Sequence, residues 1–174
     1  YVRIDRKRKF LASVFLRALG LRGGDEIIRT FYQVDRINLR DNSLYWSVGE
    51  GLVGQRSRKD VKVGDISIGE GKKITKSHIE GLRKAGVKDI AITDEALEGA
   101  FAAADIVDPA TGEVLLEANE ELTQRVVAMA HEKGVDKIDV FFPEKDEVGP
   151  IMSATLKKDP VKSQSEALLE IYRK

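Results

Sequence analysis

Two glycine-rich stretches carry the residue types that hold phosphate groups in nucleotide-binding proteins. The first, residues 49–54, reads Gly-Glu-Gly-Leu-Val-Gly and satisfies the G-x-G-x-x-G pattern of dinucleotide sites. That pattern needs a helix directly after it, because the helix N-terminus binds the pyrophosphate. The residues from Gln55 to Asp60 offer no apolar face that could pack such a helix on a sheet. We therefore interpret the glycines as a loop. That the chain is an independent nucleotide-binding enzyme is kept as the third hypothesis about its function, after the two that are given below.

The second glycine-rich stretch runs from Gly69 to Thr75 and has some features of a phosphate-binding loop. Ile66 stands where the first glycine of that motif belongs, and Lys73 stands where a Ser or Thr should bind magnesium. The match therefore fails at two of the positions that carry the chemistry. We predict a hairpin turn here.

The histidines and the clustered carboxylates of the chain do not form a metal or catalytic set by spacing. His78 and His131 have no second His or carboxylate placed to complete a metal site, and we interpret them as solvated helix residues. Glu117, Glu120 and Glu121 stand near a predicted helix start, where the helix dipole favours negative charge. We therefore expect no catalytic residue, no metal site and no cofactor.

A basic run near the start of the chain is the remaining candidate site. Its members are Arg3, Arg6, Lys7, Arg8 and Lys9. A helix is predicted to begin at about Phe10, and its dipole disfavours each cation there by several tenths of a kcal/mol, on the order of 0.3. A nearby anion such as a nucleic-acid phosphate would reverse that sign. Two interpretations stay open, a solvated basic run and a contact with an anionic partner.

The overall composition limits the classes of partner. The chain of 174 residues has 29 Lys and Arg against 29 Asp and Glu, so attraction to nucleic acid must come from a local cluster. Cysteine is absent, which excludes disulfides and thiol catalysis. No apolar run approaches the roughly 20 residues that a membrane helix needs. We expect a soluble, cytoplasmic protein that is a piece of something larger.

Apolar periodicity predicts two helices at the start of the chain. Apolar residues recur at helical spacing from Phe10 to Leu19, and Gly20 ends that run. Asp25 can cap a second, short helix. The apolar stripe of this second helix consists of Ile27, Ile28, Phe31 and Tyr32.

Two further signals predict a hairpin and a terminal helix. Apolar and polar residues alternate on either side of Asp41-Asn42, which is the pattern of a β-hairpin with one buried face. Ser163 and Glu166 stand at the spacing of a capping box and start the terminal helix. Because the period changes from helix to strand at the hairpin, we place a domain boundary near Asp41.

Residues 64–142 contain a diverged internal repeat with an offset of 48 positions. The matched pairs are Thr75 and Thr123, Gly86 and Gly134, Val87 and Val135, and Ile90 and Ile138. In each copy the Thr caps a helix, the Gly ends it in the left-handed conformation, and Val and Ile begin a strand. Each copy is therefore predicted as strand, helix, strand. A turn at residues 108–112 adds a hairpin to the second copy.

Both flanks of the chain closely resemble the lobe of the bacterial RNA polymerase β subunit. The resemblance is carried by residues 2–10 and 15–19 at one end and by residues 159–173 at the other. The middle resembles the external domain that some bacterial lineages insert into the lobe. The positions that carry this second resemblance include Asp41, Asn42, Leu52, Gly54, Lys73, Ile74, Thr75, His78 and Ile79.

The resemblance implies a place beside DNA and no catalysis by this region. The family's lobe helps form one jaw of the cleft that holds downstream DNA, and the insertion lies on the outer surface. Magnesium is held in that family by aspartates of the partner subunit β′, none of which maps here. Gly49 and Gly51 stand where the family usually has Pro and Arg, which puts the local loop shape in doubt.

The sequence thus predicts an α+β fold in two parts. Residues 1–40 and 142–174 form a small helical lobe subdomain, interrupted by a β-rich inserted external domain, residues 41–141, with the duplicated strand-helix-strand unit. We expect a non-catalytic part of the transcription machinery whose partners are other polymerase subunits, notably β′, and downstream DNA. In the alternative, the insertion is chiefly a docking module for transcription regulators, which an exposed apolar patch on it would favour. No membrane contact is expected.

Overall fold

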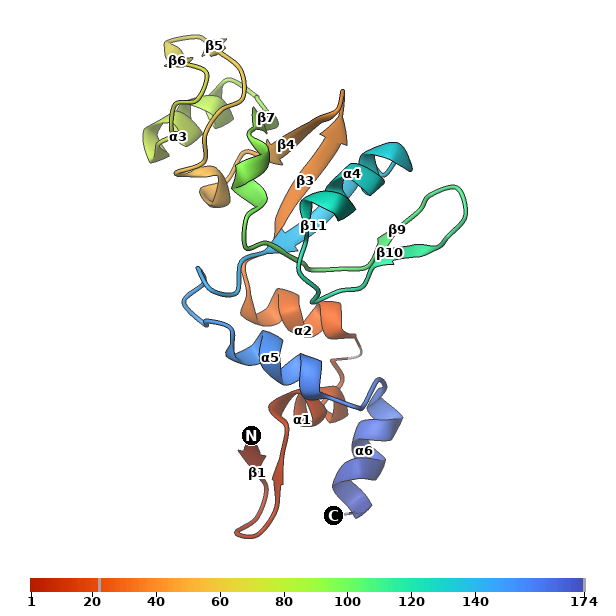
Figure 1. Ribbon diagram of the computed structural model, residues 1–174. Coiled ribbons are helices and arrows are strands. Elements are labelled where there is room, and N and C mark those ends of the chain that lie inside the picture. The colour runs from red at the N-terminus through yellow and green to blue at the C-terminus, as the bar shows by residue number, and fades with distance from the viewer. Residues whose placement is uncertain (22, 174) are drawn as a thin grey trace.

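The computed structural model describes residues 1–21 and 23–173 as an elongated molecule (Figure 1). Helices α1, α2, α5 and α6 and an N-terminal hairpin occupy one end, while a five-stranded antiparallel sheet and two smaller hairpins occupy the other. The predicted α+β class is confirmed. The bounds of the four helices are Ala12–Ala18 (α1), Gly24–Phe31 (α2), Ile151–Lys158 (α5) and Gln164–Arg173 (α6).

Apolar stripes hold the helical end together. Val14 of α1 packs with Val161 and Ala167, which joins the first helix to the last across most of the sequence. In α2, Ile27 and Ile28 are fully buried, as their spacing predicts. The N-terminal hairpin consists of β1 (Val2–Arg3) and β2 (Lys9–Phe10) and is absent from the sequence prediction.

The helix caps correct two details of the prediction. Gly23, not Asp25, is the N-cap of α2, and Asp25 lies in the first turn of that helix. An added Cβ at Gly23 would lie 2.2 Å from the Asp25 carboxylate, so the acid folds back over the cap position. At α6 the Ser163 hydroxyl accepts from the Glu166 N–H at 3.2 Å, whereas the Glu166 carboxylate accepts from Lys162 rather than from Ser163. The second hydrogen bond of the capping box therefore comes from the residue before Ser163 and not from Ser163 itself.

The central sheet has the strand order β7-β4-β3-β11-β8, and every neighbouring pair is antiparallel. The strands are β3 (Asp35–Arg40), β4 (Ser43–Ser47), β7 (Asp89–Ile92), β8 (Phe101–Ala102) and β11 (Lys137–Phe141). Asp41 and Asn42 join β3 to β4 with φ of 51° and 53°, as a two-residue type I′ turn allows, and the predicted hairpin is confirmed. A domain boundary near Asp41 would cut through this hairpin, because β3 lies between β4 and β11.

Two units of similar build flank the β3–β4 hairpin. The first unit, residues 55–92, contains β5 (Val61–Val63), β6 (Ile66–Ile68), α3 (Lys76–Lys84) and β7. The second unit, residues 103–140, contains β9 (Ile106–Val107), β10 (Val114–Leu116), α4 (Gln124–Glu132) and most of β11. The β5–β6 hairpin was missed in the sequence, because it turns at Gly64 and Asp65 and not at residues 69–75, where a hairpin turn was predicted. Short 3-10 helices at Glu50–Leu52 (η1) and Asp94–Leu97 (η2) complete the sheet end.

The matched residues of the repeat occupy the same structural positions. Thr75 and Thr123 are the N-caps of α3 and α4, and each side chain accepts a backbone N–H three residues on. Gly86 and Gly134 follow the two helices with φ of 77° and 78°, as predicted. The strands after the two helices also pair at equivalent positions, since Ile90 pairs with Trp46 and Ile138 pairs with Ile37. These four residues lie in one row across four strands. That the two units superpose as duplicated copies stays a prediction.

A buried polar network joins the helical end to the sheet end. The Tyr32 hydroxyl donates to the Gly149 carbonyl at 2.6 Å and accepts from the Ser153 N–H at 3.1 Å. Asn119, in the left-handed conformation at φ 69°, donates to the Ser153 carbonyl at 2.9 Å and accepts from its hydroxyl. Tyr32 also packs on the Phe141 ring at 4.8 Å between centroids. The two ends therefore share a satisfied polar and aromatic contact rather than a bare linker.

Candidate nucleic-acid interface

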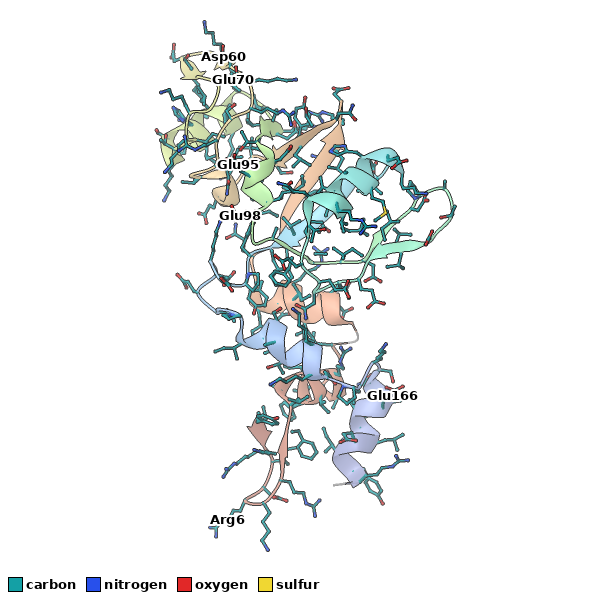
Figure 2. The ribbon with its side chains drawn as sticks, in the orientation of Figure 1. Arg6, Asp60, Glu70, Glu95, Glu98 and Glu166 are labelled. Atoms are coloured by element: carbon teal, nitrogen blue, oxygen red, sulfur yellow. The ribbon has the colours of Figure 1, made fainter. Side chains whose placement is uncertain are left out.

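The N-terminal hairpin carries all five residues of the predicted basic site. Phe10 anchors the hairpin, with 3% of its surface exposed, and the five cations are exposed. Asp5 closes the turn, because its carboxylate accepts from the N–H groups of Lys7 at 2.8 Å and Arg8 at 2.9 Å. The hydrogen bond from the Lys7 N–H is the main cause of the lowered pKa of the Asp5 carboxyl group. Figure 2 shows Arg6 at the tip, pointing away from the body of the protein.

Only part of this basic run is free to meet an anion. Arg8 pairs with Asp5 at 3.6 Å, and the Lys9 ammonium lies 4.7 Å from the Tyr1 ring centroid. Within residues 1–21 and 23–173, the side chains of Arg3, Arg6 and Lys7 have no ion pair. The hairpin also carries the tip away from α1 (Figure 2). Because the helix dipole acts only within one turn, its predicted unfavourable effect on the cations does not reach Arg6. The site thus rests on three exposed cations of a projecting hairpin.

Neither glycine-rich stretch has the geometry of a phosphate site. Residues 50–52 form the short η1 helix, and no α-helix follows it before β5. An added Cβ at Gly51 would overlap the Asp35 carboxylate, so a larger residue there would displace that side chain. Burial raises the pKa of Asp35. At the second stretch the Lys72 N–H donates to the Gly69 carbonyl at 3.0 Å, which closes a turn. The predicted hairpin is wrong, because β6 before this turn pairs with β5 and Lys73 after it pairs with Arg56.

Two carboxylates of the sheet accept hydrogen bonds from arginines. Asp139 on β11 accepts from Arg29 at 2.6 Å and from Arg36 at 3.1 Å, and Asp89 on β7 accepts from Arg40 at 2.6 Å. Burial raises the pKa of Asp139, but the two guanidinium groups outweigh burial and hold it below its ordinary value of 3.8. The described part of the chain contains no group of three or more His, Asp or Glu placed to hold a metal ion. None of its helices is both long and apolar enough to cross a lipid bilayer.

A larger basic surface lies on the first unit and was missed in the sequence. Residues 55–92 contain ten Lys and Arg against five Asp and Glu, a net charge of +5. Arg58 pairs with Asp94 at 3.3 Å, and Arg56 donates to the Gly71 carbonyl at 2.9 Å. The other eight cations are exposed and form no ion pair with any residue that the structure describes; we call them the α3 surface. They are Lys59, Lys62, Lys72, Lys73, Lys76, Arg83, Lys84 and Lys88.

The signal for the α3 surface was present in the sequence but was spread out. The N-terminal run stands out because four of its cations are consecutive, whereas the α3 surface has no more than two in a row. Counting charge over each copy of the repeat would have found it. The second unit, residues 103–140, has three Lys and Arg against nine Asp and Glu, a net charge of −6.

Comparison with known proteins gives the family. No protein-family model matches the sequence. The chain is 50% identical over 176 residues to the DNA-directed RNA polymerase subunit beta of Solibacter usitatus and 48% identical over 182 residues to that of Koribacter versatilis. It is 37% identical over 177 residues to the same subunit of Sorangium cellulosum. Each match covers 100% of the chain but only 12 to 13% of the relative. Over its whole length the chain therefore belongs to the family of RNA polymerase β subunits, as a segment of that subunit.

Proposed function

We propose that the chain is a non-catalytic part of the β subunit in DNA-templated transcription, a lobe beside downstream DNA that carries a surface insertion. The observation that carries this proposal is the projecting hairpin with Arg3, Arg6 and Lys7 exposed and unpaired within the described residues. Sequence-independent contact with phosphates needs exposed cations and little else. The remaining β segments, β′ and downstream DNA are the proposed partners.

The division into lobe and insertion follows the sheet in this proposal. Because β3 is paired on both sides, we assign residues 35–141 to the insertion and residues 1–34 and 142–174 to the lobe. This moves the first boundary back from Asp41 and leaves the second unchanged. The N-terminal hairpin and α6 then belong to one body, which lies at the opposite end from α3 (Figure 1).

The test replaces the three free cations in an assembled polymerase. The variant Arg3→Gln, Arg6→Gln, Lys7→Gln should shorten the lifetime of polymerase–DNA complexes and lower the salt slope by up to about 2.7, at about 0.9 per phosphate contact. A control of equal charge change is Arg125→Gln, Lys137→Gln, Lys158→Gln, which alters exposed residues away from the hairpin. Equal lifetimes and slopes for the two variants would exclude the DNA contact.

A second candidate function, docking of transcription regulators, is favoured by one observation on the second unit. Val107 and Val114 face each other across the β9–β10 hairpin and are 39% and 46% exposed. Two neighbouring valines amid acidic residues suit a small protein contact better than a nucleic acid. The double change Val107→Thr, Val114→Thr should then alter the response to a regulator and leave DNA-complex lifetimes unchanged.

Absence of catalysis by this segment is also part of the proposal. Highly purified chain should neither hydrolyse nor polymerise nucleotides, because no residue set for metal-assisted phosphoryl transfer stands in its sequence. Turnover that disappears when a residue of this chain is replaced would contradict it.

A further inference from the structure

We propose that the α3 surface is a second nucleic-acid-binding surface, which holds a phosphodiester backbone without regard to base sequence. It is separate from the N-terminal hairpin, because α3 and β5–β6 lie at the opposite end of the molecule (Figure 1). Its eight exposed cations, unpaired among the described residues, exceed the three of the hairpin. Charge of this density is not required by the fold, since exposed lysines contribute little to stability.

The first unit holds these cations on a firmly packed body. Ile79 and Leu82 bury one side of α3 in the main core, so Lys76, Arg83 and Lys84 face solvent on the other side. Helix α3 lies against β6, and an added Cβ at Gly81 would be 2.1 Å from the end of the Ile66 side chain. A larger side chain at position 81 would therefore push the helix and the hairpin apart or displace that isoleucine. The packing of α3 on β6 therefore holds the exposed cations of the helix and of the hairpin on one body.

The chemistry of the surface favours a phosphate backbone over a protein partner. Residues 55–92, all of them described, include none of the exposed large apolar side chains of the molecule. Protein interfaces have an apolar, often aromatic centre and are depleted in lysine. Residues 55–92 also lack Phe, Tyr and Trp, the large rings on which unstacked bases usually stack. What remains is the charge itself, which binds phosphates of any sequence.

The acidic groups nearby limit the surface but do not cancel it. Glu80 lies between Lys76 and Lys84 on the exposed side of α3, and Asp60 and Glu70 lie at the end of the unit (Figure 2). The Asp60 carboxylate already has a hydrogen-bond donor within the unit, because it accepts from the Glu70 N–H at 2.7 Å. The surface therefore binds through a few phosphates rather than through all eight cations.

The first experiment compares two triple variants of the assembled polymerase on duplex DNA. The variant Lys73→Gln, Lys84→Gln, Lys88→Gln leaves the N-terminal hairpin intact, so its result is independent of the hairpin proposal. We expect complexes that dissociate several-fold faster at 0.1 M salt, with a salt slope lower by up to about 2.7. The control is again Arg125→Gln, Lys137→Gln, Lys158→Gln, with unchanged thermal unfolding required of both. Equal slopes for variant and control would exclude a contact with duplex DNA and, without an RNA adduct in the crosslinking experiment below, would overturn the proposal.

A second experiment identifies what touches the surface. A photo-crosslinking amino acid at position 73 or 84 of the same polymerase, irradiated during transcription, should label nucleic acid. Nuclease digestion then separates the sources, since DNase removes a DNA adduct and RNase an RNA adduct, and either supports the proposal. Adducts only to protein, whether a polymerase subunit or a regulator, would overturn it in favour of a docking surface.

Discussion

The two units that flank the β3–β4 hairpin have the same order of elements and opposite charge. Both place a hairpin, a Thr-capped helix, a glycine at positive φ and a strand in that order, 48 residues apart. Yet the first has a net charge of +5 and the second of −6. The comparison teaches that a few cap, turn and strand positions set this local architecture, while the solvent-facing positions are free to diverge in charge.

The buried positions of the two helices differ as well. Leu82 of α3 corresponds to Ala130 of α4, and both are completely buried. Helix α3 fills its core with Ile79 and Leu82, whereas α4 uses Val126 and Ala130. The first unit thus buries more apolar volume under its helix than the second.

The largest predicted effect tests this difference in core volume. Leu82→Ala should lower the free energy of unfolding by about 2 to 5 kcal/mol, because the transfer cost adds to that of the cavity. Val126→Ala, which removes two carbon groups at about 0.8 kcal/mol each, should cost about 1.6 kcal/mol before any cavity contribution. Urea denaturation of both variants measures the two losses. Equal losses would mean that the helices support the sheet equally.

The next effect concerns strand positions 48 residues apart, where the first unit has Ala91 and the second has Asp139. Asp139→Asn should cost about 1 to 2 kcal/mol at pH 7, since both arginines are partly exposed and solvent screens them. Because folding depresses the pKa of Asp139, its contribution is complete above 3.8 and is lost as pH falls further. Asp35, with a raised pKa, acts oppositely and stabilises as pH falls toward 3.8.

Stability measured against pH separates these two carboxyl groups. The wild-type chain should lose stability below pH 3.8 more steeply than the Asp139→Asn variant, whose curve should be flatter there. Both curves should rise alike as pH falls toward 3.8, because both keep Asp35. A variant with the wild-type slope below that pH would show that Asp139 is not the responsible group.

The glycines that follow helices α3 and α4 should respond alike when each is replaced by alanine. Gly86→Ala and Gly134→Ala each force an L-residue into the left-handed region, which costs about 1 to 2 kcal/mol before a gain of about 0.4 to 1 from the stiffer unfolded chain. No atom lies within 4 Å of an added Cβ at either position, so strain alone acts. We expect a net loss of about 1 kcal/mol for each and less for Asn. Losses that differ by more than that amount would break the equivalence of the two helix ends.

The smallest effects should come from two ion pairs whose cations are partly exposed. Arg58 lies 3.3 Å from Asp94, and Lys133 lies 4.0 Å from Asp108. Arg58→Gln and Lys133→Gln should each change stability by less than about 0.5 kcal/mol, since solvent screens each cation and holding its side chain costs entropy. Thermal unfolding at low and high salt gives the measurement. A larger loss in one variant would assign that pair a structural role.

Local chemistry explains which parts of the fold could be predicted. The Asp41-Asn42 turn, the Thr75 cap and the glycine that ends α3 each depend on one or two residues with few conformational options. The N-terminal hairpin could not be found this way, because its strands are two residues long and its turn depends on Asp5. The β3–β11 pairing joins residues about a hundred positions apart, which only tertiary packing fixes.

The candidate site was predictable in composition but not in availability. The sequence gives five cations near the start, yet it does not tell that Arg8 is taken by Asp5 and that Lys9 lies over Tyr1. In the sequence, consecutive charges are also easier to recognise than charges that are spread along one unit. Lys59 and Lys88 are 29 residues apart in the chain and still belong to one unit.

The strand order turns the opposite charges of the units into a permanent electric dipole moment. Strands β7 and β11 end the two units and are held three strand spacings apart, about 14 Å at about 4.8 Å each. A chain with zero net charge therefore feels no net pull in a uniform field but does feel a torque. Near a polyanion that torque favours the orientation in which the first unit faces the polyanion and the second faces away.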